Sequence, residues 1–115
     1  MKGMREILET LQKRYRLVVL AGDGKDSVNL KLNNFNLRQF FSKIYSSWSE
    51  KMHKEEVKLY EKVLTEENIN PKEALFIDDI EAHINIANKI GINTILFKNS
   101  EQLKQDLAKF SIFLD

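Results

Sequence analysis

Short apolar runs alternate with amphipathic segments along most of the chain, and this alternation restricts the fold more than any other feature. The apolar runs lie within RLVVLAG, SKIYSS, ALFI and NTILF. The continuous stretch LVVLA suits a strand that is covered on both faces, as in a parallel sheet. Strands that alternate with helices indicate βαβ units. The pattern therefore predicts an α/β fold in which a parallel sheet lies between helices.

Four other segments place apolar residues on one face at helical spacing. These residues are Ile7, Leu8, Leu11 and Tyr15 in the first segment, Val57, Tyr60 and Leu64 in the second, Ile84, Ala87 and Ile90 in the third, and Leu103, Leu107 and Phe110 in the fourth. The sequence also marks where local elements begin and end. Asn70 and Pro71 predict a short helical turn, Gly91 predicts a left-handed end to the third helix, and Ser100 is the predicted N-cap of the fourth.

The composition is that of one ordinary globular domain. The chain has 115 residues, of which 43% are hydrophobic and 30% are charged, and its net charge is +1. This balance predicts neither a nucleic-acid partner nor an acidic membrane surface as a partner. There is no cysteine, which excludes disulfides and thiolate chemistry. Without a signal-peptide pattern or an apolar run long enough to span a membrane, we expect a cytoplasmic location.

Two adjacent acidic residues, Asp78 and Asp79, follow the run ALFI. In open α/β sheets, ligands bind beyond the carboxyl ends of the strands. An acidic pair at this place can hold a metal or a reacting group, or it can begin the next helix, because carboxylates favour helix N-termini. The residue types by themselves favour the helix cap. By the same standard, Asp23 beside Gly22 is an ordinary turn and Lys54 is a solvated lysine.

The segment EALFIDDIEAHINIANKIGINTILFKNSEQLKQDL resembles the fourth motif of the haloacid dehalogenase-like superfamily. The likeness is greatest to the phosphatase-like N-terminal domain of epoxide hydrolases and to sugar-phosphate phosphatases. In that group a strand ends in an acidic pair and a glycine closes the next helix twelve residues later, as Gly91 follows Asp79 here. The resemblance implies that Asp78 and Asp79 are metal-side carboxylates for Mg²⁺.

Two further segments resemble the family less closely. HKEEVKLYEKVL is similar to the third motif, and Lys54 stands at the lysine that neutralises the phosphoryl group in the family. RLVVLAG is similar to the second motif, but Ala21 occupies the place of a serine or threonine that donates a hydrogen bond to the phosphoryl group. In the helix after the acidic pair, His83 stands where relatives usually have asparagine.

The first family motif, Asp-x-Asp after an apolar strand, has no counterpart in the sequence. In the family its first aspartate is the nucleophile, so the resemblance implies no nucleophile in this chain. We therefore expect residues 1–115 to form a single truncated core domain of the haloacid dehalogenase-like type. Its three-layer, Rossmann-like parallel sheet would have about four strands, without the first family strand and the cap. The isolated chain would bind Mg²⁺ weakly and would be catalytically inactive.

Two alternatives follow from other readings of the same residues. The chain can be the C-terminal half of a split Mg²⁺-dependent phosphatase that a complementing N-terminal chain completes. In the truncated domain itself, the missing strand predicts either a narrower sheet or a homodimer in which two copies close the gap. The other alternative is a small-molecule or phosphate binding module. In that case AGDGKDS, which contains Gly22 and Asp23, would wrap an anion with backbone N–H groups.

Overall fold

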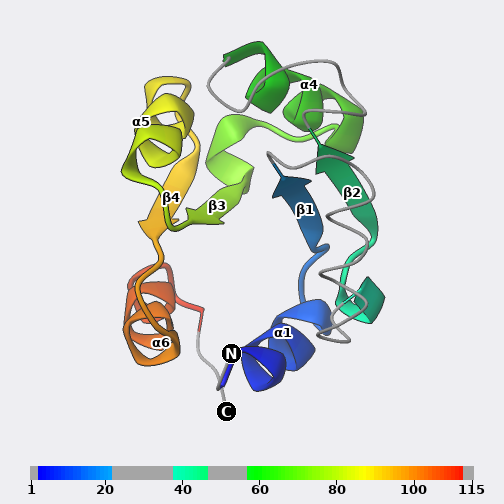
Figure 1. The fold of residues 1–115 in the computed structure, drawn as a ribbon. Coiled ribbons are helices and arrows are strands. Elements are labelled where there is room, and N and C mark those ends of the chain that lie inside the picture. Colours follow the sequence, from blue (N-terminus) through cyan, green and yellow to red (C-terminus); the bar gives the residue numbers. More distant parts are fainter. Residues whose placement is uncertain (1–2, 22–37, 47–56, 113–115) are drawn as a thin grey trace. The chain divides into compact units, whose positions relative to one another are not determined.

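A computed structural model describes residues 3–21, 38–46 and 57–112 (Figure 1). The chain forms two compact units. The first comprises Met1–His53 together with Leu114–Asp115, and the second comprises Lys54–Phe113. Each unit contains one pair of parallel strands, β1 with β2 in the first and β3 with β4 in the second.

The first unit contains helix α1 (Met4–Gln12), strand β1 (Val18–Ala21), the short 3₁₀ helix η1 (Arg38–Phe40) and strand β2 (Lys43–Ser46). Both strands fall inside the predicted runs, RLVVLAG and SKIYSS, so these two predictions are confirmed. The strands are parallel, with Val18 opposite Lys43 at one end and Ala21 opposite Ser46 at the other.

Helix α1 buries one face and ends earlier than its apolar pattern indicates. Its buried residues are Ile7, Leu8 and Leu11. Tyr15, which the pattern placed on the same face, is 45% exposed. The prediction for Tyr15 is wrong because α1 ends at Gln12, so helical periodicity no longer directs the side chain of Tyr15 inward.

The second unit contains helix α4 (Val57–Glu67), the 3₁₀ helix η2 (Pro71–Glu73), strand β3 (Leu75–Asp78), helix α5 (Glu81–Lys89), strand β4 (Asn93–Leu96) and helix α6 (Ser100–Lys109). Strands β3 and β4 are parallel, with Leu75 opposite Asn93. Helix α5 packs against both strands, and α6 packs against β4. Tyr60 of α4 meets Phe76 of β3 edge to face, with ring centroids 5.4 Å apart.

Most of the core of the second unit comes from the predicted apolar faces, although Val57 and Ile90 of those faces are only half-buried. Its buried hydrophobic residues are Leu59, Tyr60, Leu64, Ile84, Ala87, Ile92, Ile95, Leu103 and Leu107. Phe110 was predicted to continue the stripe of Leu103 and Leu107, but it is 40% exposed. It lies just after the last residue of α6, as the C-cap, and therefore leaves the buried face.

Two of the three predicted helix boundaries are confirmed. Asn70 is the N-cap of η2, with Pro71 in its first turn. Gly91 follows α5 with φ of 90°, the left-handed conformation predicted for it. The prediction for Ser100 is wrong, because the N-cap of α6 is Asn99, whose Oδ1 accepts the backbone N–H of Gln102 at 2.8 Å.

The α/β class predicted from the alternating pattern is confirmed. The described strands make two parallel pairs, β1–β2 and β3–β4. A single three-layer sheet of about four strands is not confirmed and stays a prediction. The feature that matters for function is the connection from β3 to α5, where the acidic pair lies.

Candidate functional site

The acidic pair lies between β3 and α5. Asp78 is the last residue of β3, and α5 begins at Glu81. Ile80 is the N-cap of α5 and keeps an extended backbone, so the chain turns within two residues from strand to helix. The pair therefore stands at the carboxyl end of a parallel strand, which is where ligands bind in α/β proteins.

Asp78 points inward and both of its carboxylate oxygens are engaged. The residue is 8% exposed. Its Oδ1 accepts the backbone N–H of Ile80 at 2.8 Å, and its Oδ2 lies 3.2 Å from Nδ1 of His83, which is also 8% exposed. An ionised carboxylate only accepts hydrogen bonds, so Nδ1 of His83 carries the proton in this contact. These two donors compensate for the burial of the charge of Asp78.

Asp79 has the opposite environment. Its side chain is exposed, and it makes no hydrogen bond or ion pair within the part of the chain that the structure describes. The N-terminus of α5 lies next to it, and the unpaired N–H groups of a helix N-terminus carry partial positive charge. The two adjacent carboxylates thus differ in role, since Asp78 fixes the turn while Asp79 is open to solvent and to ligands.

The chemistry of Asp79 suits a hard cation, but the described residues provide only part of a metal site. Mg²⁺ prefers carboxylate oxygens and an octahedral set of ligands, several of which are usually water. Residues 3–21, 38–46 and 57–112 contain no group of three or more His, Cys, Asp or Glu side chains placed to hold a metal ion. Asp79 alone would leave Mg²⁺ mostly hydrated and weakly bound.

Of the residues predicted to bind metal or phosphate or to take part in catalysis, the structure describes only Asp78 and Asp79, which lie side by side at the end of β3. Lys54, Gly22 and Asp23 lie outside the described residues. Ala21 is the last residue of β1. The roles proposed for Lys54 and for the AGDGKDS segment therefore stay predictions.

His83 is the neighbour of Asp78 that sequence reasoning missed. It was singled out only because relatives usually have asparagine at that place. Its contact with Asp78 spans five residues, from the end of a strand to the first turn of a helix. The available signal was the polarity of His83 within an otherwise apolar helix face, and this signal does not identify the partner of His83.

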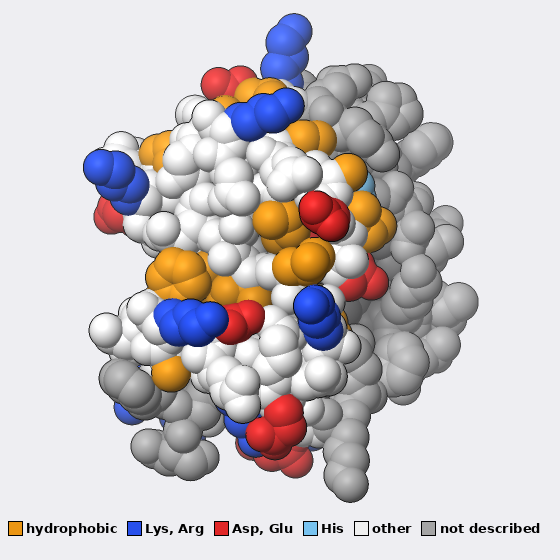
Figure 2. Space-filling model, turned by 90° about the vertical axis from the view of Figure 1, so that its left-hand side faces the viewer, with side chains coloured by type: hydrophobic (Ala, Val, Ile, Leu, Met, Phe, Trp, Pro, Cys, Tyr) orange, Lys and Arg blue, Asp and Glu red, His pale blue; other side chains and the backbone are white. Residues whose placement is uncertain are grey.

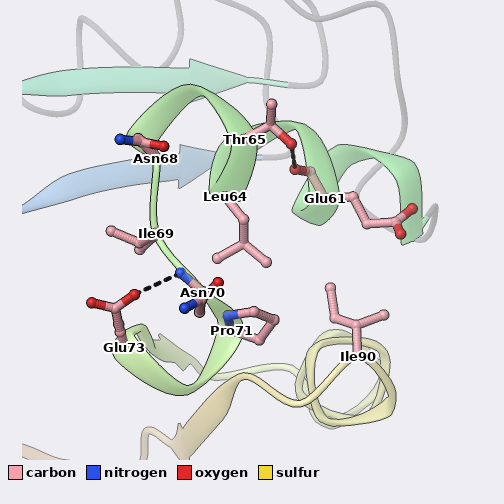
Figure 3. A pocket seen from close by; sticks show the side chains of 9 residues that line it. All are labelled: Glu61, Leu64, Thr65, Asn68, Ile69, Asn70, Pro71, Glu73 and Ile90. Atoms are coloured by element: carbon pink, nitrogen blue, oxygen red, sulfur yellow. Dashed lines mark hydrogen bonds between the residues drawn. The ribbon is translucent and has the colours of Figure 1, made fainter.

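A separate open pocket of about 580 Å³ lies beside α4, η2 and the end of α5 (Figure 3). Leu64, Pro71 and Ile90 converge on it. The residues of η2 precede β3, so this pocket lies at the amino end of the strand and not at Asp78. Two of its polar groups serve local structure. Thr65 donates to the carbonyl of Glu61 within α4, and the backbone N–H of Asn70 donates to the side chain of Glu73 at the start of η2, both at 2.9 Å.

Charged side chains of both signs are mixed on the face of the molecule that Figure 2 shows. Lysine and arginine alternate there with aspartate and glutamate, and hydrophobic side chains form small groups between them. Among the described residues, no helix is both long enough and apolar enough to cross a membrane.

The family comparison matches most of the chain. Residues 1–97 match the model of the haloacid dehalogenase-like hydrolase family. Since the match covers more than half of the chain, it is sufficient to assign the family. The narrower likeness to epoxide hydrolase N-terminal domains and sugar-phosphate phosphatases is not tested by this match.

Solved structures resemble the chain over most of its length. A predicted HAD-like hydrolase from Porphyromonas gingivalis is 22% identical with a TM-score of 0.81, covering 96% of this chain and 57% of that one. A HAD-superfamily hydrolase of subfamily IA from Geobacter sulfurreducens is 31% identical with a TM-score of 0.72. The alignment covers 81% of this chain and 44% of that one.

A variant of a HAD family enzyme from Bacteroides thetaiotaomicron, solved in complex with magnesium and inorganic phosphate, is 26% identical with a TM-score of 0.73. The alignment covers 87% of this chain and 56% of that one. The chain thus spans about half the length of these solved proteins.

Proposed function

Since the chain belongs to the haloacid dehalogenase-like hydrolase family, we propose that it supplies the carboxylate of Asp79 to a Mg²⁺-dependent phosphohydrolase centre. The observation that carries this proposal is the division within the acidic pair. Asp78 is buried and held by two donors, whereas Asp79 is exposed at the carboxyl end of β3 with no partner among the described residues.

Asp79 would hold the metal through its carboxylate oxygens, and Asp78 would keep the turn in place behind it. A bound Mg²⁺ would neutralise charge that develops on the transferred phosphoryl group. The magnesium and inorganic phosphate in the solved Bacteroides variant support this chemistry for the family fold. That a phosphate compound is the substrate of this chain is inferred from that relative and is part of the proposal.

We further propose that residues 1–115 do not turn over substrate by themselves. The sequence contains no apolar run followed by Asp-x-Asp, the motif that would provide the nucleophile in this family. Asp79 is assigned to the metal, and Asp78 has both oxygens occupied. Loss of a nucleophile commonly lowers the rate by several orders of magnitude.

The backbone of β3 in the second unit supports a partner that adds a strand beside it. Asn93 and Phe97 donate their backbone N–H groups to the carbonyls of Ala74 and Asp78, at 3.3 Å and 2.8 Å. Alternate residues of a parallel strand bond to the same neighbour, so Leu75 and Ile77 direct their backbone groups to the other edge of β3. We propose that this edge accepts a strand from an N-terminal chain that carries the nucleophile, with a second copy of the chain as the alternative donor.

The first experiment combines an activity assay with cation binding. Purified residues 1–115 are assayed with p-nitrophenyl phosphate and Mg²⁺, and NMR spectra are recorded during titration with paramagnetic Mn²⁺. We expect no turnover above buffer, and we expect Mn²⁺ to broaden the amide signals of Asp79 and Ile80 first. The substitution Asp79→Asn should abolish this selective broadening.

The control is Glu101→Gln, which removes an exposed carboxylate from the first turn of α6 and should leave the broadening at Asp79 unchanged. Mg²⁺-dependent turnover that falls in Asp79→Asn would overturn the proposed inactivity. Broadening that is identical in wild type and Asp79→Asn would overturn the role of Asp79. To test the complementing partner, a second chain that contains a strand followed by Asp-x-Asp is added to residues 1–115, and we expect phosphatase activity to appear. Sedimentation measures the mass of the protein in solution and so tests the homodimer.

A further inference from the structure

We infer that His83 positions the exposed carboxylate of Asp79 by holding its neighbour Asp78, an inference that rests on the proposed function. His83 does not face the proposed ligand itself. It is 8% exposed and its Nδ1 lies 3.2 Å from Oδ2 of Asp78, whose side chain is 4% exposed. His83 would therefore act through Asp78 and not through contact with a metal or substrate.

The contacts of Asp78 tie together the strand, the turn and the helix. Oδ1 of Asp78 binds the backbone N–H of Ile80, and Oδ2 binds a side chain from the first turn of α5. Asp79 is the one residue between Asp78 and Ile80, which the first of these hydrogen bonds joins. Since the backbone on both sides of Asp79 is fixed in this way, the direction of its Cα–Cβ bond is fixed as well, and a ligand group whose backbone is held in advance binds more tightly.

Loss of the imidazole would weaken the anchor of the turn beside Asp79. Oδ2 of Asp78 would lose the donor that joins it to the first turn of α5, while Oδ1 would keep the backbone N–H of Ile80. The side chain of Asp78 would then turn toward solvent beside Asp79, where two adjacent carboxylates repel each other. This movement changes the position and the electrostatic surroundings of Asp79.

The nature of the donor, and not the size of the side chain, should decide the outcome. Asparagine has an NH₂ group that can replace Nδ1 as the donor to Oδ2, whereas leucine fills space but donates nothing. We therefore expect His83→Asn to retain the function of the wild-type residue and His83→Leu to lose it. A residue that only fills the core would give the reverse order.

The experiment measures the affinity for Mn²⁺ at the amide of Asp79 in wild type, His83→Asn and His83→Leu. We expect about tenfold weaker binding in His83→Leu, in the range seen when a hydrogen-bond partner behind a metal ligand is removed, and about wild-type affinity in His83→Asn. Leu107→Ala, which opens the core of the same unit at a fully buried residue of α6, is the control for general loss of stability. Its affinity should be unchanged while the protein is folded.

Equal affinities in wild type and His83→Leu would overturn the inference even if Asp79→Asn abolishes binding, so the failure of this inference can be told from the failure of the proposed function. If His83→Leu does not fold, the ring nitrogens of wild-type His83 give the answer. We expect their ¹⁵N shifts to show a protonated Nδ1, and an unprotonated Nδ1 would overturn the inference.

Discussion

The substitution Gly91→Ala tests whether the family-like spacing from Asp79 to Gly91 is a demand of the backbone or of the ligand site. Gly91 has φ of 90°. Its backbone N–H donates to the backbone carbonyl of Asn88 at 3.0 Å, and the backbone N–H of Ile92 donates to the backbone carbonyl of Ala87 at 3.2 Å. This is the Schellman arrangement that closes a helix with a left-handed residue. Glycine is needed here to end α5, and it makes no contact with the acidic pair.

The loss of folding free energy in Gly91→Ala can be estimated because steric contact and backbone conformation can be considered separately. A Cβ atom at this position would lie 3.6 Å from the Cβ of Pro71, an ordinary contact, so no steric clash is added. The left-handed backbone costs about 1–2 kcal/mol for a residue with a Cβ atom. Reduced freedom of the unfolded chain returns about 0.4–1 kcal/mol. We therefore expect a net loss of about 1 kcal/mol, or roughly 4 °C in the melting temperature.

Thermal and urea unfolding measure this loss, and Gly91→Asn is the matched variant. Asparagine tolerates the left-handed region, so it should destabilise less than alanine. Mn²⁺ affinity at Asp79 should be unchanged in both variants. A Gly91→Ala protein as stable as wild type would refute the conformational argument, and weaker Mn²⁺ binding in a folded Gly91→Ala protein would show that the spacing serves the ligand site directly.

Two further predictions concern α6. Asn99→Ala should lower the free energy of unfolding by about 1 kcal/mol in urea denaturation, because Asn99 caps the helix, whereas Ser100→Ala should change it little. Hydrogen bonds from Gln102 and then Lys109 hold the pKa of Asp106 below its usual value, so ¹³C NMR titration should show this pKa rising in Gln102→Leu. Since the folded-state pKa is lowered, the stabilisation from Asp106 is present above its unfolded-state pKa and is lost as the pH falls through the folded-state value.

The strands were predictable because continuous apolar runs bounded by turn residues leave few alternatives. The ends of the helices were less predictable, since apolar periodicity indicates which face of a helix is buried but not where the helix ends. Tyr15 and Phe110 have the correct spacing and still lie beyond the last residues of α1 and α6. The N-cap of α6 could have been assigned, because Gln102 stands three residues after Asn99 and completes a capping box.

The partner of Asp78 could not be predicted from local rules. Whether a histidine five residues later reaches back to a strand end depends on the length and angle of the turn between them. Here the turn takes two residues, and the N–H of Ile80 already holds one oxygen of Asp78. The helix then presents His83 in its first turn, where Nδ1 meets the other oxygen. Tertiary geometry, and not residue type, decides which carboxylate is buried.

The sequence offered two interpretations of the acidic pair, a helix cap or a ligand site, and the helix-cap interpretation is wrong, because Ile80 is the N-cap of α5 and no side chain among the described residues caps this helix. Asp78 instead fixes the turn that leads into α5, since its Oδ1 accepts the backbone N–H of Ile80, the N-cap residue. Asp79 has the exposure that a ligand site requires. A single aspartate at the end of β3 would have to serve one purpose or the other. With two in succession, the buried carboxylate fixes the turn and the exposed one is left for the metal that we propose.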